Sequence, residues 1–104
     1  MNAAEAAELA LAQPDAVEAD HHGRRSFRVG GRIFATLWDE THMNVMLDED
    51  GIRTAVADRP EVCAEVWWGR RLAAVRVDLT LADPRLVTEL LADAWERRAG
   101  KPRH

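Results

Sequence analysis

The sequence predicts an α+β fold, in which an antiparallel sheet of about five strands forms one layer and helices form the other. Two pairs of strand-like segments are each joined by a glycine turn, at Gly30-Gly31 and at Gly69, which is typical of β-hairpins. Helix-forming residues open the chain, and an amphipathic helical pattern closes it after Asp83-Pro84. We therefore expect two hairpins and a further strand, covered by N- and C-terminal helices with a short helix between them.

The first half of the chain is expected to hold one helix and three strands. Asn2 is a suitable N-cap with Glu5 three residues later, and the helix should end near Ala12, before Pro14. A turn and loop follow. Strands are expected over 26–29, 32–38 and 42–47. In the second of these, strict alternation would place Ile33, Ala35 and Leu37 on one face and Phe34, Thr36 and Trp38 on the other.

The second half is expected to hold two helices and the second hairpin. Asp48 is a natural N-cap for a helix that ends near Asp58. The hairpin strands are expected over 61–68 and 72–79. Asp83 and Pro84 then begin the last helix, for which Gly100 is a plausible residue after the C-cap. We expect one domain over 1–100 and a frayed tail over 101–104.

Composition narrows the class of protein. The chain has 104 residues, 47% of them hydrophobic and 31% charged, which is typical of a globular protein with one core. With 14 basic and 18 acidic residues the net charge is -4, so nucleic-acid binding would require a local basic patch. A lone cysteine and the lack of a long apolar run predict a cytoplasmic protein that neither crosses nor binds a membrane.

Three segments resemble a known family. They are His21-His22-Gly23-Arg24-Arg25-Ser26-Phe27-Arg28-Val29-Gly30-Gly31-Arg32-Ile33-Phe34-Ala35, then Asn44-Val45-Met46-Leu47, then Arg76-Val77-Asp78-Leu79 before the last helix. Their order resembles the MmcQ/YjbR-like family. The resemblance implies a CyaY-like fold and a "double-wing" DNA-binding role, and it supplies no agreed catalytic residues. The chain departs from many relatives at 13–15, where they have Leu-Pro-Gly, and at 65–71, where they have a His, Asn and Lys group.

The segment containing Trp67, Trp68, Arg70 and Arg71 is a candidate binding surface. Neighbouring strand residues point to opposite faces, so one indole is expected to be exposed beside two guanidinium groups. Such a surface suits stacking on a nucleic-acid base or another small planar ligand, or a protein contact. The alternative is that both indoles pack, one in the core and one beneath a helix or a partner chain.

Arg24 and Arg25, with Arg28 and Arg32, concentrate positive charge on the first hairpin. If they lie beside Arg70 and Arg71, the two groups form the basic patch that DNA binding needs. The alternative is a solvated sheet face whose arginines pair with neighbouring carboxylates.

No catalytic or metal motif accompanies these residues. His21, His22 and His42 fit no metal-ligand spacing, and we expect neither a metal nor another cofactor. Cys63 is expected to be a buried structural thiol. The sequence thus predicts a small non-enzymatic binding module, DNA-binding or regulatory by resemblance. The alternative is a protein or small-molecule interaction domain without a nucleic-acid role. An enzyme is a third, weaker alternative, because no pattern assembles a nucleophile, a base and an orienting group.

Overall fold

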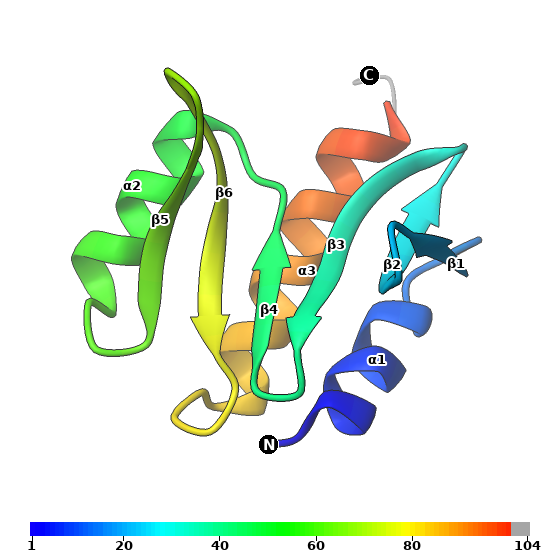
Figure 1. The fold of residues 1–104 in the computed structure, drawn as a ribbon, viewed down its shortest axis with the longest axis horizontal. Helices are drawn as coiled ribbons and strands as arrows, with labels where there is room; N and C mark the ends of the chain where they lie inside the picture. Colours follow the sequence, from blue (N-terminus) through cyan, green and yellow to red (C-terminus); the bar gives the residue numbers. More distant parts are fainter. Residues whose placement is uncertain (101–104) are drawn as a thin grey trace.

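The computed structural model describes residues 1–100, in which three helices cover one face of a six-stranded antiparallel sheet (Figure 1). The elements in chain order are α1 (Ala3–Leu11), β1 (Val17–His21), β2 (Arg24–Val29), β3 (Arg32–Asp39), β4 (His42–Val45), α2 (Glu49–Asp58), β5 (Cys63–Trp68), β6 (Arg71–Asp78) and α3 (Pro84–Ala99). The α+β class and the antiparallel sheet confirm the prediction from sequence. The frayed tail expected over 101–104 lies outside the described residues.

The strand order is β1-β2-β3-β4-β6-β5, and the turns of the two predicted hairpins lie at the same end of the sheet. Ala35 of β3 pairs with Val45 of β4, and Val45 pairs with Val75 of β6. The start of β3 and the start of β6 therefore lie at one end, which is the upper end in Figure 1. The Gly30-Gly31 turn precedes the first of these strands, and the Gly69-Arg70 turn precedes the second.

One strand is additional to those expected. Residues Val17–His21, predicted to be loop, form β1 and pair with β2 at the edge of the sheet. The connecting turn places His22 and Gly23 at φ 54° and 82°, the left-handed geometry of a two-residue hairpin turn. Most of β1 is exposed and it includes Glu18 and Asp20, so it lacks the apolar alternation that identifies a half-buried strand.

The helix termini follow the predicted capping chemistry. Asn2 and Glu5 form a reciprocal capping box at the start of α1. The Asp48 carboxylate accepts from the Gly51 backbone N–H at 2.7 Å, and Asp83 accepts from Arg85 N–H at 2.8 Å. These caps fix where the three helices begin, and the buried residues of each helix form the face that packs against the sheet.

A single apolar core lies between the helices and the sheet. It includes alanines of α1, Ile52 of α2, Leu91 of α3 and the inward residues of β2, β3, β4 and β6. The opposite face of the sheet carries a row of paired polar residues from β2 to β6, which are Ser26, Thr36, Asn44 and Arg76. This face has no helix on it, so it is the surface available to a ligand. No helix within 1–100 is long and apolar enough to cross a membrane.

The expected alternation along β3 is wrong at its start. The pairing of β2 with β3 shifts between Phe27 and Arg28, so that Phe27 lies opposite Ala35 while Arg28 lies opposite Ile33. This β-bulge at Phe34 puts two successive side chains on the core side, as classic bulges do. Phe34 is fully buried in the core, whereas Ile33 is outside the core and lines a groove on the open face.

Candidate functional site

A groove with a volume of about 550 Å³ lies over the open face of the sheet. Residues from five strands, from the β1–β2 and β2–β3 turns, from the segment after β4 and from the end of α3 form it. They are His21, His22, Arg24, Arg28, Gly31, Arg32, Ile33, Thr36, Trp38, Asn44, Met46, Trp68 and Arg98. The volume lies within the range of about 300–1,000 Å³ that is common for ligand sites.

The groove is strongly basic although the protein is acidic. Among the described residues, four arginines and two histidines line it, and no aspartate or glutamate does. Arg25 and Arg53, which lie outside the groove, pair with carboxylates; Arg25 Nε is 2.6 Å from Glu18 Oε2. Within residues 1–100, none of the four groove arginines forms an ion pair with a carboxylate. Their charge is therefore left for a ligand.

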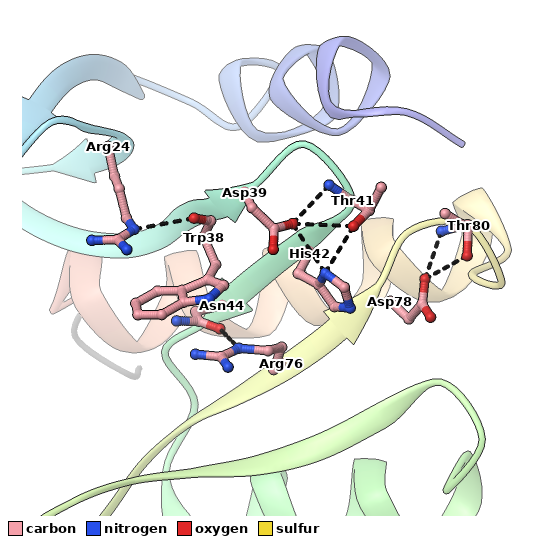
Figure 2. A network of polar contacts seen from close by, with 9 residues as sticks. All are labelled: Arg24, Trp38, Asp39, Thr41, His42, Asn44, Arg76, Asp78 and Thr80. Carbon is pink, nitrogen blue, oxygen red and sulfur yellow. Dashed lines mark hydrogen bonds and ion pairs between the residues drawn. The ribbon is translucent and has the colours of Figure 1, made fainter.

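Trp38 organises one side of the groove by stacking between two guanidinium groups (Figure 2). The guanidinium carbon of Arg24 is 3.9 Å from the centre of the indole, and that of Arg76 is 4.3 Å from it. Arg24 Nε also donates to the Trp38 backbone carbonyl at 3.1 Å, and Arg76 Nε donates to Asn44 Oδ1 at 2.9 Å. Both distances to the ring are well within cation–π range. The indole thus holds two cations in place before any ligand arrives.

Arg28 is held in a similar way by neutral acceptors. Its Nε donates to Ser26 Oγ at 3.2 Å, and its Nη2 donates to the Asp20 carbonyl at 3.3 Å. Ser26 in turn donates to the Ala19 carbonyl at 2.8 Å. Because none of these acceptors carries a formal charge, the guanidinium is positioned without being neutralised. Groups that are fixed in advance lose less conformational entropy when a ligand binds.

The structure brings only some of the predicted site residues together. Arg24 and Trp68 line the groove, and Arg71 lies with its guanidinium carbon 5.5 Å from the Trp68 ring. Trp67 is on the helix side of the sheet, where its Nε1 donates to Glu65 at 3.1 Å. Trp67 and Trp68 are both about half exposed in the single chain, so neither indole lies in the core.

The arginines expected on one surface also divide between two faces. Arg25 pairs with Glu18 and approaches the core residue Phe27, so it points away from the groove. Arg70 is exposed in the β5–β6 turn and does not line the groove. Reasoning from sequence missed Trp38 and Arg98 as site residues. The alternation in β3 does place Trp38 on the face of Thr36, but no local pattern connects the end of the last helix with this face.

A second polar network lies at the other end of β3 and β4 (Figure 2). The Asp39 carboxylate accepts from the Thr41 backbone N–H at 2.8 Å and from its hydroxyl at 3.1 Å, and it contacts His42 Nδ1 at 3.0 Å. These contacts lower the pKa of Asp39 from 3.8 to about 2, and the hydrogen bond from the Thr41 N–H has the largest effect. The charged carboxylate therefore stabilises the β3–β4 turn.

This network predicts a pH-dependent effect of Asp39→Asn. A carboxyl group whose pKa is lower in the folded state adds stability above its unfolded pKa, and this stability is lost as the pH falls through the folded pKa. The substitution should therefore reduce the free energy of unfolding near neutral pH, and this reduction should be smaller when it is measured at about pH 3. Urea denaturation at both pH values would measure it, with Glu40→Gln in the same turn as the control. An equal reduction at both pH values would contradict the role of the charge.

Neither a reactive cysteine nor a cluster of metal ligands is found in the described part of the chain. Cys63 is buried, as predicted, and burial raises the pKa of its thiol, which opposes formation of the nucleophilic thiolate. No set of three or more histidine, cysteine, aspartate or glutamate side chains within 1–100 could hold a metal ion. What the groove offers instead is positive charge and aromatic surface.

The fold and the groove define a class of protein, a small α+β domain with a basic groove on the open face of an antiparallel sheet. The family model described as YjbR matches residues 11–97. The chain therefore belongs to the YjbR family, as the resemblance of its sequence indicated. No curated protein and no solved structure gives a significant match.

Proposed function

We propose that this protein is a non-enzymatic binding module that holds single-stranded DNA in the groove on its open sheet face. One observation carries the proposal. In a protein of net charge -4, four arginines that have no carboxylate partner within residues 1–100 converge on one groove that also contains two tryptophans. Positive grooves with aromatic side chains are the usual means by which proteins bind single strands.

Single-stranded DNA fits the aromatic residues better than duplex DNA does. The Trp68 side chain is 51% exposed and lines the groove, so a base can stack on it. In a duplex the faces of the bases are covered by their neighbours, and only their edges are accessible in the grooves. The "double-wing" DNA-binding role implied by the family resemblance is compatible with either form. The exposed indole favours the single strand.

We expect the protein to prefer single-stranded over duplex DNA and to lose affinity for it as the salt concentration rises. Fluorescence anisotropy with a labelled oligothymidine should show binding that is stronger than binding to a duplex of the same length. If the groove arginines contact two to four phosphates, log K should fall against log salt with a slope of about -1.4 to -2.8. Absence of binding at low salt, or a preference for the duplex, would contradict the proposal.

A small planar anion is the second candidate, favoured by the volume of the groove. About 550 Å³ is sufficient for a single nucleotide or a similar molecule. The length of the ligand separates the two candidates. Affinity should rise as the oligonucleotide lengthens if the natural ligand is a strand, whereas a mononucleotide should already reach the full affinity if it is a small molecule.

A further inference from the structure

At one end of the groove lie two arginines that form no ion pair with a carboxylate within residues 1–100. Arg32 lies beside the β2–β3 turn and Arg98 lies in the last turn of α3, and both line the groove. Arg98 also lines a neighbouring pocket of about 260 Å³ together with Arg71 and Arg97. Arg98 therefore lies between the two hollows, with further arginines on either side.

The guanidinium of Arg98 has an unmet hydrogen-bonding requirement. Its Nε atom is buried and has no hydrogen-bond partner within residues 1–100. Burial, together with the positive charges of Arg97, Arg71 and Arg32, lowers the pKa of Arg98. A buried donor without an acceptor is costly, and so is a cation held among cations. An anion bound at this point would offset both costs.

The neighbouring carboxylates do not meet this requirement. Asp48 and Glu49 line the second pocket and not the groove. The Asp48 carboxylate caps α2 through Gly51, and Glu49 lies 3.9 Å from Arg53. Arg98 lines the groove as well as the second pocket, and its positive charge acts together with that of Arg32, which also lines the groove.

We propose that Arg32 and Arg98 form a subsite for a terminal phosphate monoester, so that the groove binds a strand by its phosphorylated end. This inference rests on the proposed function, because it places one end of the bound strand. A monoester carries a charge between about -1.5 and -2 near neutral pH and offers three acceptor oxygens, which matches two guanidinium groups. An internal phosphodiester carries a single negative charge and would leave one of the two cations unbalanced.

Two titrations of the protein test the subsite. In the first, inorganic phosphate is added to ¹⁵N-labelled protein while the arginine Nε–H resonances are followed by NMR. The Arg98 resonance should shift and saturate, and Arg32→Gln should weaken this binding about tenfold for each charge-assisted hydrogen bond lost. Arg85, at the other end of α3, should not respond. Absence of a saturable Arg98 shift would overturn the subsite, whether or not DNA binds.

The second titration compares oligothymidines that carry a 5′-phosphate, a 3′-phosphate or no terminal phosphate. One phosphorylated form should bind about tenfold more tightly than the unmodified form, and Arg98→Gln should abolish this preference, whereas Arg85→Gln should preserve it. Equal affinity for all three would overturn the subsite and leave the proposed function standing. If no oligonucleotide bound while phosphate still shifted Arg98, the proposed function would fail and the anion subsite would remain.

Removing Arg98 should not unfold the protein, since the substitution relieves repulsion among the arginines. The melting temperature of Arg98→Gln is therefore expected to equal or exceed that of the unsubstituted protein. A lower melting temperature would show that Arg98 is satisfied within the fold, and this result would overturn the subsite.

Discussion

Phe34→Ala is expected to lower the free energy of unfolding by about 3–5 kcal/mol, the usual cost of removing a fully buried aromatic side chain. The β-bulge turns Phe34 into the core, where it is 0% exposed. Truncating it would therefore leave a cavity among the surrounding core side chains. Chemical denaturation followed by circular dichroism would measure the change.

Ile33→Ala is the matched comparison, because strict alternation along β3 predicts the opposite order of effects. Ile33 is only partly buried and lines the groove, so its truncation should cost about 1 kcal/mol. Equal costs for the two substitutions, or a larger cost at Ile33, would show that the bulge is not where the structure places it.

The double substitution Arg24→Ala, Arg28→Ala is expected to weaken binding of single-stranded DNA about one hundredfold, about tenfold for each charge-assisted contact. Both side chains line the groove and are held by neutral acceptors, so no carboxylate is left unpaired when they are removed. If each contacts one phosphate, the salt slope should also become shallower by about 1.4. Anisotropy titrations at several salt concentrations give both quantities.

The matched control removes the same charge from outside the groove. Arg25 and Arg53 both pair with carboxylates, and neither lines the groove. The Arg25→Ala, Arg53→Ala variant has the same net charge as the groove variant, so a general electrostatic effect would weaken binding equally in both. We expect a loss of less than about threefold for the control, since distant exposed charges are screened.

Local chemistry predicted much of the fold. The caps at Asn2, Asp48 and Asp83 and the Gly30-Gly31 turn are all decided by a few neighbouring residues, and all are where the sequence indicated. β1 was missed because its stability comes from pairing with β2, and this leaves no apolar pattern in an exposed edge strand. The bulge at Phe34 was missed because alternation assumes that the pairing register never shifts.

The candidate site was predictable only in part, for a related reason. Alternation correctly indicates that Trp67 and Trp68 diverge, and it applies equally to Arg24 and Arg25. It does not say which member of each pair faces away from the helices. The inclusion of Arg98 depends on where the end of α3 lies relative to the sheet, and no local pattern encodes that placement.

The four indole N–H groups provide the most direct test of the groove as the binding site. Trp38 and Trp68 line it, whereas Trp67 donates to Glu65 on the other face and Trp95 donates to the Pro14 carbonyl at 2.8 Å. Each indole gives its own resonance in an ¹⁵N-correlated NMR spectrum, so one titration with oligothymidine reports on both faces at once. If the groove is the binding site, the Trp38 and Trp68 resonances should move while those of Trp67 and Trp95 stay in place. Movement of the Trp67 resonance without that of Trp68, or no movement at all, would contradict it.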